Sequence, residues 1–278
     1  MKEPPRNQQA LAARLRNLAD DLGIAEPRLR RTVAHTIVGQ MLPAGVVKGG
    51  ASIRFRTNEQ DARLTRDLDF SPRPGTTTED FEDQLADNLE RGWHHVTGRL
   101  VTKRKAQPEG VPTEYVMQPY EIKLSFHGTA WTTVVFEVGH PEIDSTDTPE
   151  HRLAEDIGSL FADLGLPVPE PIAVMAAAHQ AAQKIHACTG PTASQRAHDL
   201  VDLQILNRAD PLDPIEVAEA GARLFAYRRQ QPWPPTVVAH DTWPELYAAA
   251  TSELATEVLP LDSAVAWLNA LIRRSGRP

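Results

Sequence analysis

The feature that most constrains the fold is a change of character near residue 150 of this 278-residue chain. Before it, β-forming residues gather at 65–71, 96–103, 120–126 and 132–138, and His127-Gly128 predicts a hairpin between the last two stretches. Beyond it the apolar spacing predicts helices only, at 171–188, 194–207, 214–229, 242–256 and 261–274. We therefore predict an α+β fold, with a mixed-sheet domain over residues 1–150 and a helical domain over residues 151–278.

The first domain should also contain helices. Apolar residues at helical spacing predict helices at 7–22, 26–42 and 77–91, and a short helix should begin near residue 51, after a glycine turn. The length of the chain is sufficient for a substantial core.

Composition bounds the function classes. The chain has no run of 18 apolar residues, its first residues lack the apolar stretch of a signal peptide, and it has a single cysteine, Cys188. These features predict a cytoplasmic protein with no membrane partner. The net charge of −8 argues weakly against a protein that coats nucleic acid, but a local basic channel remains compatible with it.

The most informative tripeptide is Asp67-Leu68-Asp69. Residues two apart on a strand point to the same side, so both carboxylates should face one point while Leu68 and Phe70 face the core. Two close negative charges repel, and a cation resolves the conflict. Hard oxygen ligands on a rigid strand suit Mg²⁺. The alternative is a solvated strand edge with two unrelated acids.

A glycine turn precedes this strand. Gly49 and Gly50 allow the backbone to approach a ligand closely, Ser52 adds a hydroxyl donor, and Arg54 or Arg56 adds positive charge. These features are compatible with phosphate binding, although neither the Walker pattern nor the Rossmann fingerprint is present. The alternative is a simple tight turn.

Two charged residues stand out on the later strands. Glu137 lies in an otherwise apolar strand and could be the third carboxylate of a metal site; alternatively it is an edge charge facing water. Lys123 shares a face with Glu121 and Ser125. It could pair with Glu137, touch a phosphate, or form an ordinary cross-strand ion pair.

The helical half offers a second set of charges. Lys184 lies near the end of an alanine-rich helix, and Arg196, Asp199 and Asp202 follow at three-residue steps that place them on one helix face. A local salt bridge is the default interpretation. No HExxH, Cys-His metal spacing or GxSxG motif occurs, so neither zinc binding nor Ser-His-Asp hydrolysis is expected.

Four sequence elements follow one another along the chain: Lys48-Gly49-Gly50, Arg63-x-Thr65-x-Asp67-x-Asp69, Lys184, and Arg196-x-x-Asp199-x-x-Asp202. Together, over about residues 40–207, they resemble the AbiEii/AbiGii (MenT-like) nucleotidyltransferase toxins. Many relatives carry Gly-Gly-Thr where this chain has Gly50-Ala51-Ser52, and Glu137 matches no family motif.

The resemblance implies a polymerase-β-like nucleotidyltransferase core and a toxin of a toxin-antitoxin or phage-defence pair. It implies an AbiEi-type antitoxin as partner and an RNA acceptor, for which we expect a tRNA 3′ end. It also implies catalytic Asp67 and Asp69, with Lys184 and Asp199 as the matching lysine and acid of the helical half.

The resulting hypothesis assigns a role to each residue. Asp67, Asp69 and Glu137 would hold Mg²⁺ on a nucleoside triphosphate, CTP or another, while Lys48 and residues 49–52 cradle its phosphates. Lys184 would offset charge on the leaving pyrophosphate, and Asp199, held by Arg196, would orient Lys184 or the nucleotide.

Three alternatives to this hypothesis stay open. They are transfer to a small molecule or protein, a nucleotide-binding partner protein without catalysis, and a purely structural role for these charges. Thr65 shares the face of Asp67, so a phosphate on Thr65 would compete with the incoming triphosphate and act as an off-switch.

Overall fold

The computed structural model describes residues 2–106, 116–252 and 254–275. The chain forms two compact units. The sheet unit comprises residues 1–55, 64–141 and 149–174, and the helical unit comprises residues 56–63, 142–148 and 175–278. The predicted boundary at residue 150 therefore differs from the observed division, which comes after Val174 and lets the chain cross between the units several times.

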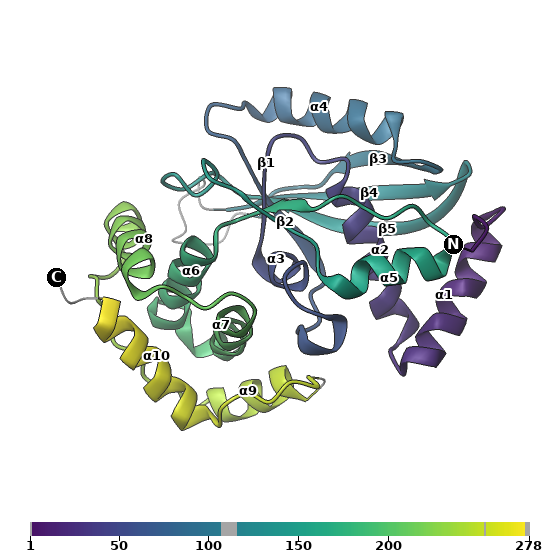
Figure 1. Cartoon of the computed structure of the whole chain (residues 1–278). Helices are drawn as coiled ribbons and strands as arrows, with labels where there is room; N and C mark the ends of the chain where they lie inside the picture. The colour runs from purple at the N-terminus through teal and green to yellow at the C-terminus, as the bar shows by residue number, and fades with distance from the viewer. Residues whose placement is uncertain (1, 107–115, 253, 276–278) are drawn as a thin grey trace. The chain divides into compact units, whose positions relative to one another are not determined.

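A seven-stranded mixed sheet forms the centre of the sheet unit, in the order β3-β4-β5-β2-β1-β7-β6 (Figure 1). β2 pairs in parallel with β5 and β1 with β7, and all other neighbours are antiparallel. The strands are β1 (Gly45–Lys48), β2 (Asp67–Pro72), β3 (Val96–Thr102), β4 (Gln118–Phe126), β5 (Thr129–Val138), β6 (Glu150–Arg152) and β7 (Ile172–Val174).

Alternating burial explains how β2 joins this sheet. Leu68 and Phe70 are fully buried, whereas Asp67 and Asp69 are half-buried on the other face, as predicted. The ring of Phe70 lies 5.6 Å from that of Phe81 and 6.1 Å from that of Phe136. This aromatic cluster fixes which side of β2 faces the core, because a slip of one residue would bury both aspartates.

Four longer helices complete the core of the sheet unit: α1 (Gln8–Leu22), α2 (Glu26–Gly39), α4 (Thr78–Arg91) and α5 (Glu155–Leu164). The Asn7 side chain caps α1, and Gly23 ends it in the left-handed conformation. Thr77 caps α4, which buries Phe81, Leu85 and Leu89 in the core. Figure 1 shows α4 lying over β3.

The helical unit contains α6 (Ala177–Thr189), α7 (Ala197–Ala209), α8 (Pro214–Arg228), α9 (Trp243–Thr251) and α10 (Leu261–Ser275). Trp243 is fully buried, and its indole N–H donates to the carbonyl of Ala193 at 2.8 Å. The α7 helix is buried nearly all round, which explains why charged residues on it require partners.

The predicted α+β class is confirmed, with three local corrections. The expectation that no strands follow residue 150 is wrong, because β6 and β7 add an edge to the sheet and α5 lies between them. The helix predicted from residue 171 begins at Ala177 instead, since residues 172–174 form β7. The helix predicted at 242–256 is observed as α9, which ends at Thr251. The predicted range also contains residue 253, which lies outside the described residues. None of the described helices is long and apolar enough to span a bilayer.

Candidate active site

The acid pair lies in a cross-strand row of charge. On β2, Asp69 stands opposite Lys48 of β1 on one side and Glu137 of β5 on the other, and Asp67 stands opposite Val135. Paired residues of neighbouring strands project to the same face. Three carboxylates and one lysine therefore share one face of the sheet.

The glycine turn is pressed directly against this pair. Gly49 has a φ of 65°, and a Cβ atom at this position would lie 2.0 Å from the Asp69 Oδ2 atom. A Cβ atom at Gly50 would lie 2.7 Å from the Thr65 hydroxyl oxygen, which itself donates to the Asp67 carbonyl at 3.3 Å. Only glycine permits this approach, so the turn predicted from the sequence belongs to the same local structure as the acids.

The electrostatics of the row are unbalanced. Burial and then the charge of Asp67 raise the pKa of the Glu137 carboxyl, and Lys48 opposes this shift. The Lys48 ammonium extends toward Gly139, where an added Cβ atom would lie only 2.4 Å from its nitrogen. One lysine thus faces three carboxylates, an arrangement that favours an additional cation.

The residue types fit Mg²⁺ in part. Asp67 and Asp69 supply two hard oxygen ligands on a rigid strand, and this ion completes its shell with water and phosphate oxygens. Among the described residues, however, no group of three or more His, Cys, Asp or Glu side chains is arranged to hold a metal ion. The pair therefore fits the ion, whereas the third-ligand role of Glu137 stays a prediction.

Three other residues of the turn have structural partners. Ser52 is fully buried, so the predicted contact of its hydroxyl with a phosphate is not supported. The Arg54 guanidinium binds both carboxylate oxygens of Asp156, at 3.1 and 2.7 Å. Arg56 pairs with Asp210 and donates to the Met175 carbonyl. Of the groups predicted to contact phosphate, Lys48 and the backbone of the two glycines stay candidates.

The helical unit contains the second predicted set. The Lys184 ammonium is buried and donates to Asp199 at 2.8 Å and to Asp202 at 2.7 Å. Arg63 binds Asp202 through two contacts of 3.1 and 3.2 Å. Burial opposes ionisation of Lys184, yet the two aspartates raise its pKa. Burial likewise acts against the Asp202 anion, but Lys184 and Arg63 lower the pKa of that carboxyl.

One oxygen of this network is left over. The Asp199 Oδ2 atom is buried and has no hydrogen-bond partner among the described residues. Arg196 approaches it at 3.6 Å and His198 at 3.4 Å. Burial, together with the charges of Arg63 and Lys184, lowers the pKa of His198 and so favours its neutral form. Asp199 Oδ2 is therefore a buried acceptor flanked by the basic side chains of Arg196 and His198.

Sequence reasoning missed two members of this network. Arg63 appeared only as part of a motif, and its pairing with Asp202 spans 139 residues of sequence. His198 had no distinguishing signal beyond its position next to Asp199. The predicted residues of the two sets belong to different units: Lys48 to Glu137 lie in the sheet unit, and Lys184 to Asp199 in the helical unit.

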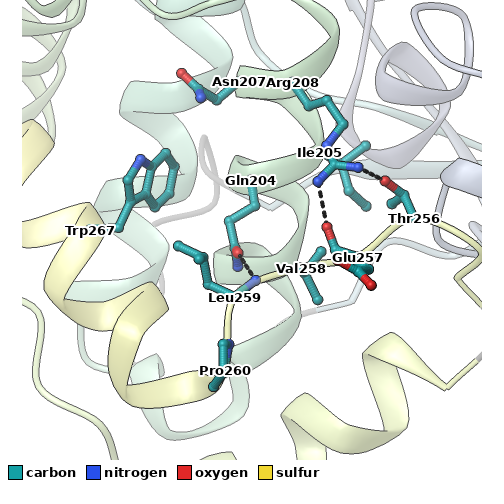
Figure 2. A pocket seen from close by; sticks show the side chains of 10 residues that line it. All are labelled: Gln204, Ile205, Asn207, Arg208, Thr256, Glu257, Val258, Leu259, Pro260 and Trp267. Carbon is teal, nitrogen blue, oxygen red and sulfur yellow. Dashed lines mark hydrogen bonds between the residues drawn. The ribbon is translucent and has the colours of Figure 1, made fainter.

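A separate cavity of about 390 Å³ lies within the helical unit, between α7, residues 256–260 and α10 (Figure 2). Its walls are fixed by hydrogen bonds, because Gln204 bridges Tyr247 and the Leu259 N–H, and Arg208 donates to Thr256 and to the Glu257 carbonyl. Trp267 lines this cavity and is half-buried. None of the predicted site residues lines it.

The comparisons with known proteins agree with the fold. The chain is similar to MenT4, a nucleotidyltransferase toxin of Mycobacterium tuberculosis, with a TM-score of 0.58, 17% identity, and coverage of 96% of this chain and 89% of that one. A candidate nucleotidyltransferase from H. pylori aligns with a TM-score of 0.44, 11% identity, and coverage of 91% and 96%. The comparison with curated proteins finds no match. The fold is that of a nucleotidyltransferase.

The family follows from the sequence match. The model of the family described as nucleotidyl transferase AbiEii toxin, type IV TA system, matches residues 31–269. The chain belongs to this family and is a nucleotidyltransferase toxin of a type IV toxin-antitoxin system, which implies an antitoxin partner. The resemblance stated from the motifs is thereby confirmed.

Proposed function

We propose that this protein transfers a nucleotide from a nucleoside triphosphate to an RNA acceptor, with the tRNA 3′ end as the favoured acceptor and Mg²⁺ as the cofactor. The observation that carries the proposal is the row of Asp67, Asp69 and Glu137, which faces Lys48 across the sheet and is pressed against the glycine turn. Such a row attracts a cation, and the backbone of the glycine turn lies directly beside it.

The sheet-unit residues would divide the work as follows. Asp67 and Asp69 would hold Mg²⁺, which when bound supplies positive charge to the phosphate oxygens that gain charge during transfer. Lys48 and the backbone of Gly49 and Gly50 would bind and orient the triphosphate. CTP or another nucleoside triphosphate fits this scheme equally, since none of these groups distinguishes bases.

The reaction would proceed in one balanced step. The acceptor 3′-hydroxyl oxygen forms a bond to the α-phosphorus while the bond from that phosphorus to the bridging oxygen breaks, and pyrophosphate leaves with the electron pair. The hydroxyl proton passes to a carboxylate of the row, for which half-buried Glu137 is our candidate. Holding both reactants beside one row of acids accounts for much of the acceleration.

For the helical unit we propose a division between positioning and contact. Lys184 is buried between two carboxylates, so it acts as a positioning residue for Asp199 and not as a direct partner of pyrophosphate. Asp199, held by the more exposed Arg196, would then help to orient the nucleotide. The role that the family resemblance implies for Asp199 thus remains part of the proposal, and Lys184 is proposed to act through Asp199.

The regulatory hypothesis for Thr65 also remains a proposal. Its hydroxyl lies against Gly50 and next to the Asp67 backbone, so a phosphate group there would occupy the space of the triphosphate. Mass spectrometry of the protein made with and without its neighbour gene's product would test this. An unmodified Thr65 in the inactive state would contradict it.

To test the main proposal, the purified protein is incubated with each labelled nucleoside triphosphate and with total RNA, total protein or small molecules. These come from a cytoplasmic extract, because we propose that the reaction takes place in the cytoplasm. We expect label in RNA, and sequencing of tRNA 3′ ends should locate the added nucleotide. Label in protein or in a small molecule would favour the alternative acceptors. Nucleotide binding without any transfer would favour the non-catalytic alternative.

A further inference from the structure

The face of the sheet that carries the acid pair continues across β5, β4 and β3 as a polar, exposed surface. On β4 the buried residues Tyr120, Ile122 and Leu124 alternate with Glu121, Lys123 and Ser125, of which Lys123 is exposed. The same alternation leaves Thr133 and Val135 of β5 exposed, as well as Thr97 and Arg99 of β3. On β4 and β5 the buried residues Tyr120, Ile122, Leu124, Val134 and Phe136 lie on the opposite face.

Two cations face one another on this surface. Arg99 of β3 is the direct partner of Lys123 in the register, and Thr133 stands on the other side of Lys123. The alternative that Lys123 pairs with Glu137 is wrong as a directly opposite pair, because Glu137 stands opposite Pro119. Like charges directly opposite each other on neighbouring strands destabilise a sheet.

Near Lys123, another lysine of this surface has a carboxylate partner. Lys103 binds the Glu121 carboxylate at 2.8 Å. In the part of the chain that the structure describes, neither Arg99 nor Lys123 forms such an ion pair. Three hydroxyl side chains surround the two cations instead, those of Thr97, Ser125 and Thr133. Cations flanked by hydroxyl donors are the usual partners of phosphate oxygens in nucleic acids.

The position of this surface relative to the acid pair follows from the register. Asp67 pairs with Val135, and Val135 pairs with Glu121, which lies two residues before Lys123. With about 4.8 Å between strands and about 3.3 Å per residue, Lys123 lies roughly 12 Å from Asp67 and Arg99 roughly 16 Å from it, measured along the sheet. A strand of RNA that ends at the acid pair would reach both cations within a few nucleotides.

We propose that Arg99 and Lys123, with their flanking hydroxyls, bind the backbone phosphates of the RNA acceptor while its end lies at Asp67 and Asp69. This inference rests on the proposed function and adds the path of the acceptor. Exposed Val135, next to Asp67, provides an apolar surface between the two places, against which a sugar or base can pack. The proposed contact should not depend on the nucleotide sequence of the RNA, because it involves phosphates alone.

The test compares two acceptors and two matched double variants. Arg99→Gln/Lys123→Gln removes the proposed contact, and Arg6→Gln/Arg16→Gln removes two exposed cations at the N-terminal end of the chain. Steady-state transfer is measured on a single-stranded RNA of about twelve nucleotides and on a dinucleotide, which is too short to reach the cations. RNA binding is measured separately by fluorescence anisotropy over a range of salt concentrations.

We expect the first variant to raise KM for the long RNA about tenfold or more, with kcat within about twofold, and to leave KM for the dinucleotide unchanged. The dependence of log K on log salt should become shallower by about 1.4, since two phosphate contacts to a single strand are lost. The control variant should match the wild type in each measurement.

Three outcomes would overturn the inference. Equal KM values for both variants on the long RNA would sink it while leaving the proposed function intact. Absence of transfer to any RNA by the wild type would overturn the proposed function and this inference with it. Unchanged RNA kinetics combined with lost binding of the antitoxin by Arg99→Gln/Lys123→Gln would assign the surface to a protein partner instead.

Discussion

The acids of the two units are treated in opposite ways. In the helical unit Asp199 and Asp202 are buried and share the charges of Lys184 and Arg63, so two anions meet two cations. In the sheet unit Asp67, Asp69 and Glu137 are half-buried, and within the cross-strand row they face Lys48. The first arrangement is electrically closed, whereas we propose that a bound cation completes the second.

This difference separates two kinds of importance. Removing a charge from a closed buried network should damage the fold, because the partner charge is left uncompensated. Removing a charge from the open row should damage activity and spare the fold. A resemblance between sequences cannot make this distinction, since both sets of residues appear in the family motifs.

The largest expected effect is on catalysis. Asp67→Asn should reduce nucleotide transfer by about a thousandfold or more, because the variant loses a metal ligand, and its free energy of unfolding should stay equal or rise as repulsion is relieved. Steady-state transfer assays and urea unfolding measure both quantities. Asp163→Asn, at an exposed position of α5, is the control and should change neither. Full activity in Asp67→Asn would refute the central assignment.

The next effect concerns the closed network. Lys184→Met should lower the free energy of unfolding by about 3–5 kcal/mol, because it leaves Asp199 and Asp202 buried without their shared cation. Lys103→Met breaks the exposed pair with Glu121 and should have a much smaller effect on the free energy of unfolding, because solvent screens that pair. Similar values for the two variants in urea unfolding would contradict the description of the Lys184 network as closed.

A buried histidine of the helical unit gives a pH test. Burial, and then the charge of Arg228, lowers the pKa of His186 to about 4. As the pH falls from about 6.5, the unfolded chain binds a proton that folded His186 does not, so stability should fall by up to about 3 kcal/mol by pH 4 and not further below it on this account.

His186→Gln should remove this contribution, whereas His240→Gln at an exposed position controls for the loss of a histidine. Unfolding free energies measured from pH 7 to pH 4 compare the three proteins. Parallel curves for the wild type and His186→Gln would show that the buried imidazole does not resist protonation.

The glycine turn provides a test with a matched backbone control. Gly49→Ala should destabilise the protein by about 1–3 kcal/mol and lower transfer, because the new methyl group would strike Asp69 in addition to straining the backbone. Gly128→Ala shares the positive φ, at 75°, but its Cβ atom meets nothing within 4 Å. The difference between the two variants isolates the contact with Asp69, and no difference would disprove that contact.

The smallest expected effect has the opposite sign. Lys123→Thr should raise the free energy of unfolding by about 0.2–0.5 kcal/mol, because it removes the repulsion with Arg99 and places a β-branched residue on the strand. Lys103→Thr removes an ion pair instead and should not stabilise. Thermal unfolding of both variants decides the point, and a loss of stability in Lys123→Thr would show that Arg99 and Lys123 do not repel.

Much of the fold could be predicted because its signals are local. The alternation in residues 67–70 placed both aspartates on one face and Leu68 and Phe70 in the core, as the structure has them. Three-residue β6 and β7 are too short to show a period, so they were missed, and with them the true extent of the sheet unit.

The candidate site was less predictable because its partners depend on register and long-range contact. No local pattern shows that Lys48 and Glu137 flank Asp69, or that Arg99 faces Lys123. The burial of Ser52 could not be read from the turn either, since it depends on how α3 (Gly49–Arg54) packs. Sequence reasoning found the residue types of the site, and the pairing of strands determines which of them act together.

The chain passes from one unit to the other after residues 55, 63, 141, 148 and 174. Each short excursion into the helical unit is anchored by ion pairs, residues 56–63 through Arg56 and Arg63, and residues 142–148 through Glu142 and Asp144. Neither unit is thus a continuous piece of sequence. A fragment cut at any single peptide bond would carry an incomplete version of at least one unit, so truncation is unsuited to separating their activities, and point substitutions are the appropriate tool.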